Sequence, residues 1–156
     1  MNVIARLILL TIALAVMLLI GSTIASADQA YHTERLTFNA VGGAPELKAG
    51  QVINAHSNGP IQYARENYMV SGARPNQTYD VIIQVFFSST CAGTPDLALN
   101  TAVILTGSEG QGHAAHVFTP ADVAPFSPPL TVHAHWMLER DGTADYQTDC
   151  TVINLD

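Results

Sequence analysis

The stretch that decides the fold is residues 130–140, which read LTVHAHWMLER. Every second residue from Val132 to Leu138 is apolar, and histidines and Met137 stand between them. Side chains of a β-strand point alternately to the two faces of a sheet, so this pattern predicts a strand with one core face. Trp136 is the largest side chain on that face, which also contains Val132, Ala134 and Leu138.

A second stretch, residues 79–89, extends the same prediction. One of its faces is wholly apolar and comprises Tyr79, Val81, Ile83, Val85 and Phe87. Ile82 and Phe86 make the other face partly apolar as well. A strand that is buried on both sides, at the centre of a sheet, has this composition.

Short alternating segments of this kind recur along the chain, and no helical repeat of ten or more residues interrupts them. We expect eight strands, at about 33–40, 51–57, 61–71, 79–89, 98–106, 112–118, 130–140 and 145–155. The glycine-rich segment 106–112 and Asp141-Gly142 are predicted to be hairpin turns. Residues 119–122, which read TPAD, predict a single helical turn. The sequence therefore predicts an antiparallel β-sandwich.

The N-terminal 27 residues differ from the rest of the chain. They contain 20 hydrophobic residues and one charge, Arg6, and they end in Ala25-Ser26-Ala27. A basic start, an apolar run of about 14 residues and an A-x-A site are the parts of a secretory signal peptide. We expect cleavage after Ala27, which leaves residues 28–156 as a single domain; the alternative is a retained membrane anchor.

Export determines how the two cysteines are interpreted. Cys91 and Cys150 are the only cysteines of the chain, and in an oxidising compartment such a pair predicts a structural disulfide. The two cysteines are 59 residues apart, and closing a loop of that length would stabilise the fold by about 4 kcal/mol. Two free thiols are the alternative.

Charge and composition exclude some classes of partner. The chain carries a formal charge of -7, and after cleavage 5 basic and 13 acidic residues leave -8. Nucleic acids and anionic membranes bind proteins through clusters of Lys and Arg, which this chain lacks. We therefore expect neither as a partner.

One corner of the chain resembles a known family. Residues 68–81, which read YMVSGARPNQTYDV, resemble the stretch of fibronectin type III and related immunoglobulin-like domains where one strand crosses to the next sheet. Gly72, Pro75 and Tyr79 match that family's pattern, and Ala73 stands where the family usually has Leu. The resemblance implies that the Tyr79 ring caps the core while its hydroxyl bonds to the backbone near Pro75. Since four predicted strands follow Cys91, we expect a related sandwich with extra strands or a different connection order.

Histidines raise the question of a metal site. His133 and His135 are two residues apart on one predicted strand, so both imidazoles share a face, as two ligands of Zn(II) or Cu(II) would. His113 and His116 are three apart and point to opposite faces. If the strands 112–118 and 130–140 are neighbours, His113 joins the first pair; the alternative is a solvated polar face.

Other candidate sites are weaker, and no catalytic motif is present. Asp141, Asp145 and Asp149 gather near the last predicted hairpin, where they suggest either a calcium site or a solvated acidic rim. Asn76 begins an N-x-T sequon, which matters only in a host that glycosylates such sites. We therefore expect a secreted, non-enzymatic sandwich with no cofactor, which is a binding or structural module of the extracellular space or cell envelope and whose partner would be an extracellular protein or glycan; the alternative is a Zn- or Cu-binding protein.

Overall fold

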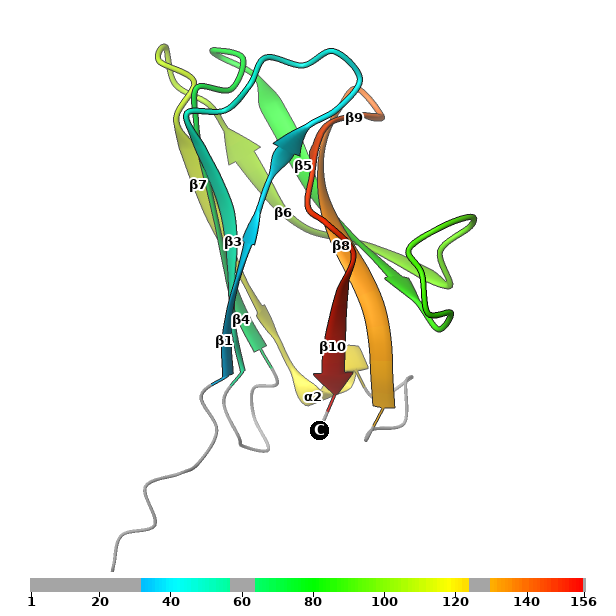
Figure 1. Cartoon of the computed structure of the whole chain (residues 1–156). Helices are drawn as coiled ribbons and strands as arrows, with labels where there is room; N and C mark the ends of the chain where they lie inside the picture. Colours follow the sequence, from blue (N-terminus) through cyan, green and yellow to red (C-terminus); the bar gives the residue numbers. More distant parts are fainter. Residues whose placement is uncertain (1–31, 57–63, 124–129, 156) are drawn as a thin grey trace, which may run out of the picture.

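The computed structural model describes residues 32–56, 64–123 and 130–155, which form two antiparallel sheets packed face to face (Figure 1). The first sheet has the strand order β1-β3-β4-β7, and the second has the order β2-β9-β8-β5-β6, with β10 also paired to β8. The strands are β1 (His32–Thr37), β2 (Asn39–Ala40), β3 (Ala49–His56), β4 (Ala64–Ser71), β5 (Thr78–Phe86), β6 (Leu97–Leu105), β7 (Gly112–Phe118), β8 (Leu130–Arg140), β9 (Thr143–Gln147) and β10 (Thr151–Leu155). The predicted all-β sandwich is confirmed. The predicted signal peptide lies outside the described residues.

The first and the last of the eight predicted strands are each divided in two. Phe38 separates β1, in the first sheet, from β2, in the second, so the chain crosses between sheets at this residue (Figure 1). The Phe38 side chain is buried, and its N–H donates to the carbonyl of Gly50 at 3.1 Å. Residues 148–150 separate β9 from β10. Both of these strands pair with β8, so only the division at Phe38 is a change of sheet. Alternation alone does not reveal that change, because the apolar period continues through Phe38.

The predicted core faces are largely confirmed. All four apolar residues named on the 130–140 strand are buried in β8, and β5 lies between β8 and β6, as expected of a central strand. Phe87 is wrongly placed: β5 ends at Phe86, which is buried, whereas Phe87 is 56% exposed. The largest buried side chains between the sheets include Trp136, Tyr68, Tyr79 and Tyr146.

The glycine-rich segment 106–111 is not a hairpin turn. It joins β6 to β7, and these strands belong to different sheets. Gly110 has φ +70°, and a Cβ atom there would lie 2.0 Å from the carbonyl oxygen of Ala73, so only glycine fits. The segment therefore serves as a crossover that packs against the Gly72-Ala73 corner.

The two other predicted turns are confirmed. Asp141 and Gly142 both have positive φ, 53° and 73°, and they join β8 to β9 as a hairpin. The helical turn is α2 (Pro120–Val123), where the Asp122 carboxylate accepts from the N–H and the hydroxyl of Thr119, both at 2.7 Å. These bonds hold the pKa of Asp122 below its usual value.

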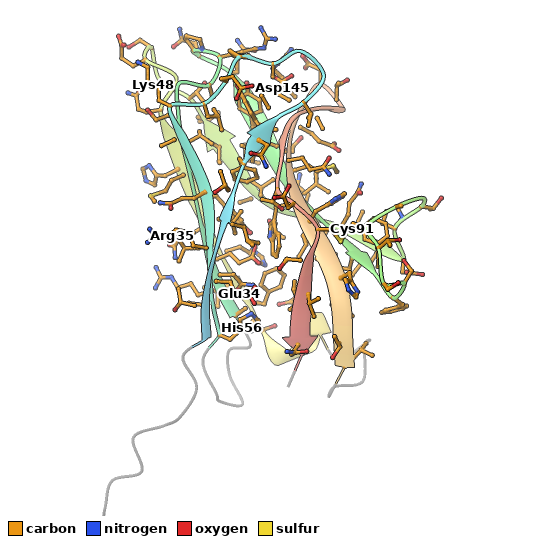
Figure 2. All side chains as sticks on the ribbon, viewed as in Figure 1. Glu34, Arg35, Lys48, His56, Cys91 and Asp145 are labelled. Carbon is orange, nitrogen blue, oxygen red and sulfur yellow. A yellow bond between two sulfur atoms is a disulfide. The ribbon has the colours of Figure 1, made fainter. Side chains whose placement is uncertain are left out.

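A disulfide joins Cys91 to Cys150, which confirms the predicted pair. Cys91 follows β5 on the outer side of the second sheet (Figure 2), and Cys150 immediately precedes β10. The bond thus fastens the 87–96 loop to the start of the last strand. A structural disulfide indicates an oxidising, extracellular environment.

Candidate functional site

His133 and His135 share the outer face of β8, as their spacing predicts. Both ring nitrogens of His135, however, already have hydrogen-bond partners. Its Nε2 lies 2.8 Å from Oε1 of Gln84, and its Nδ1 lies 3.0 Å from Nε2 of Gln147. Burial lowers the pKa of His135. The neutral ring therefore joins two strands through its hydrogen bonds, which leaves no nitrogen for a metal.

His113 and His116 do not join that pair. They lie on opposite faces of β7, and β7 and β8 are in different sheets, so the condition under which His113 would join His133 and His135 is not met. The His116 ring packs against Phe118 with centroids 4.6 Å apart. Within the described ranges, no group of three or more His, Cys, Asp or Glu side chains is placed to hold a metal ion.

Asp145 is the centre of a charged cluster at one end of the sandwich (Figure 2). Its carboxylate accepts from the Tyr79 hydroxyl at 3.1 Å, from Arg140 Nε at 3.1 Å and from Arg74 Nε at 3.3 Å. The Tyr79 ring is buried as the corner resemblance implies, but its hydroxyl binds Asp145 rather than the backbone near Pro75. The reason is that β9 brings a carboxylate to this corner.

The same cluster bears on the suggested calcium site. Asp145 is paired with two arginines, and Asp141 lies 3.3 Å from Arg140. Asp149 accepts from the amide of Asn39 at 3.5 Å. The protein's own arginines thus pair with Asp141 and Asp145, and Asp149 binds a neutral amide, so these three side chains do not gather around a shared cation site.

A buried carboxyl group that the sequence analysis missed lies between the sheets. Glu66, on β4, is 1% exposed, and its Oε2 accepts from Trp136 Nε1 at 2.8 Å and from the Tyr68 hydroxyl. The Tyr68 oxygen also lies 2.8 Å from Oγ1 of Thr101 on β6. Strands of both sheets are thereby linked through one carboxyl group.

Burial raises the pKa of Glu66 to about 7, despite the two hydrogen bonds that favour the carboxylate. A group with this pKa is typical of general acids and bases, but here it is sealed from substrate, so we interpret the cluster as structural. One signal in the sequence was available. Glu66 stands between Ala64 and Tyr68 on a face that is otherwise apolar, and such a residue must find buried partners.

The side of the sandwich formed by β6 and β7 has neither the charged cluster nor the buried carboxyl group described above, and we call it the β6–β7 flank. Each strand lies at the edge of its sheet, and neither contains Asp, Glu, Lys, Arg or Pro. Among the described residues, β7 pairs with β4 alone, without a register shift over seven residues. β6 differs from β7 in having an irregularity in its pairing with β5.

Apolar side chains are exposed on or beside this flank. Leu105 is 71% exposed, Val103 is 49% exposed and Val117 is 44% exposed. Leu105, Val103 and Met69 line one open groove of about 720 Å³, together with Gly112 and His113 at the start of β7. The groove therefore adjoins the unpaired edge of the first sheet.

Comparisons with protein-family models, with curated proteins and with solved structures find no match to this chain. Within the parts of the chain that the structure describes, no helix has the length and hydrophobicity needed to cross a bilayer. The β6–β7 flank, rather than a cluster of reactive side chains, is thus the candidate functional site.

Proposed function

We propose that this chain is an exported, non-enzymatic, immunoglobulin-like β-sandwich that binds a partner polypeptide through the β6–β7 flank, in the extracellular space or the cell envelope. Export is supported by the N-terminal 27 residues and by the disulfide. The immunoglobulin-like assignment is supported by the corner at Gly72, which has φ +83°, and by the buried Tyr79.

The observation that carries the proposal is the edge of β7 beside an apolar groove, because this edge has no Asp, Glu, Lys or Arg and pairs with no further strand of the described residues. Native proteins protect exposed edges with charges, prolines or bulges, because an open edge pairs with other chains. β7 has none of these devices. An edge left open in this way is suited to binding an added strand, whose backbone supplies affinity and whose side chains enter the groove.

The residue types of the flank favour a polypeptide over a glycan. β6 and β7 contain no Trp or Tyr, and Phe118 is buried. Exposed aliphatic side chains next to a strand edge match the side chains and backbone of another polypeptide. The partner is therefore expected to be extended where it meets β7.

Export is tested by producing the full chain in a bacterial host with a secretion pathway. The proposal predicts extracytoplasmic protein whose N-terminus is Asp28 and which has no free thiol. Cytoplasmic protein with an intact N-terminus and two titratable thiols would contradict it.

Binding through the flank is tested by photo-crosslinking in the source organism. Benzoylphenylalanine replaces Leu105 in one variant and Val152, which is 46% exposed on β10, in the control. The proposal predicts covalent adducts from position 105 and not from position 152. Absence of adducts at position 105, or equal yields at both positions, would overturn it.

A further inference from the structure

We propose that the partner of the β6–β7 flank is a second copy of this chain, added through antiparallel pairing of β7 with β7. This inference rests on the proposed function and gives it a specific occupant. The first sheets of the two copies would then form one continuous eight-stranded sheet across a two-fold axis.

The charge of the flank favours an identical partner. The chain carries -7 overall, but β6 and β7 contribute no acidic or basic residue apart from the histidines of β7. Two copies therefore meet at a neutral edge, where neither places a carboxylate against the other. A strongly charged partner would find no opposite charge on these strands.

One register of β7 on itself pairs all seven residues, and in it Ala115 lies opposite Ala115 of the second copy. On the inner face this register sets Gly112 opposite Phe118 and Ala114 opposite His116. A small side chain thus faces a large one in each pair, as cross-strand packing requires. The sequence of β7 is in this sense complementary to its own reverse.

The outer face is equally compatible with that register. Val117 of one copy comes opposite His113 of the other, in the same cross-strand row as Met69. Val117 is 44% exposed in the single chain, and the groove beside His113 is lined by Leu105 and Met69. Pairing therefore brings an exposed apolar side chain of each copy to the apolar groove of the other.

The inference is tested by cysteine cross-linking of the purified exported protein. Residues directly opposite each other in an antiparallel pair have Cα atoms about 4.5–5.5 Å apart, within the range of a disulfide. Ala115→Cys is exposed on β7 and should convert mostly to a disulfide-linked dimer under mild oxidation. The control is Thr33→Cys, exposed on β1 at the other edge of the same sheet, where the two copies' cysteines would be about 34 Å apart.

The expected result is a covalent dimer from Ala115→Cys, monomer from Thr33→Cys, and a mass twice that of one chain for the unmodified protein in sedimentation velocity. A monomeric unmodified protein, or equal cross-linking of both variants, would overturn the inference. Adducts from position 105 with a protein of another mass would then leave the proposed function standing with a different partner.

Discussion

The two long sides of the sandwich are built in opposite ways. On one side, β1 continues into β2 across the gap between the sheets, and the buried Phe38 marks the crossing (Figure 1). On the other side, β6 and β7 end their sheets with no described strand beyond them. The closed side also has charges on its edge, at Glu34 and Arg35 of β1, whereas the β6–β7 flank has none. The chain itself thus closes one side of the sandwich, whereas the proposed pairing with a second copy takes place on the other.

The largest expected effect concerns the disulfide, which fixes the chain just before β10. The double variant Cys91→Ala/Cys150→Ala should lose about 4 kcal/mol of unfolding free energy, because its unfolded chain is no longer constrained. Urea unfolding of the purified exported protein measures this loss. An unchanged midpoint would show that the bond contributes nothing to the stability of the domain.

The second largest loss of stability is expected from Phe38, the buried residue where the chain crosses between the sheets. Phe38→Ala removes a buried ring and should cost about 3 kcal/mol, at the lower end of the usual range because a crossing relaxes more easily than the core centre. Phe87→Ala is the matched control, since Phe87 is 56% exposed, and it should change the stability by less than about 1 kcal/mol. Similar losses of stability for both variants in thermal unfolding would show that the buried Phe38 ring does not hold the crossing between the sheets.

Glu66, in the interior between the two sides, should give the protein a pH-dependent stability. Its pKa in the folded state is raised from 4.5 to about 7, so the folded state binds the proton more tightly than the unfolded state. Stability from this group is full below about pH 4.5 and falls as the pH rises to about 7, by at most about 3 kcal/mol.

Glu66→Gln tests this origin, because glutamine keeps an acceptor oxygen for Trp136 and cannot ionise. The difference in melting temperature between wild type and variant should change between pH 4.5 and pH 8, with the wild type losing more as the pH rises. A difference that is constant over this range would exclude Glu66 as the titrating group.

The smallest expected effect on the single chain is on the open side. Val117→Ala should alter the unfolding free energy by less than about 0.5 kcal/mol when measured at concentrations where the chain is monomeric, because Val117 is 44% exposed and lies outside the buried core. A loss as large as that of Phe38→Ala would mean that the flank is part of the folded core, and the contrast between the sides would disappear.

The sequence predicted the parts of this fold that depend on local alternation. The core face of β8, that of β5 apart from Phe87, the Asp141-Gly142 hairpin and the Cys91–Cys150 bond are as expected. It did not predict the changes of sheet at Phe38 and between β6 and β7, because a strand pattern records which face is buried and not which neighbour it pairs with.

The candidate sites also depend on which strands are neighbours, and the alternating pattern does not show this. The histidines were judged by spacing within one strand, but whether His113 meets His133 depends on which strands are neighbours. Glu66 was missed because Trp136, its partner in the other sheet, is 70 residues away along the chain. The β6–β7 flank is recognised because its two strands contain no Asp, Glu, Lys or Arg and lie at the edges of the described sheets. Which strands lie at the edges is known only once the strand order is known.

The proposed pairing of β7 with a second copy is tested by sedimentation equilibrium of one matched pair of variants. Val117→Lys places a charge in the proposed pairing, and Val152→Lys places the same charge at a position of nearly equal exposure on β10, 46% against 44%. Val117→Lys should weaken dimerisation by at least about tenfold, while Val152→Lys should associate like the wild type. Equal association of the two variants would contradict it.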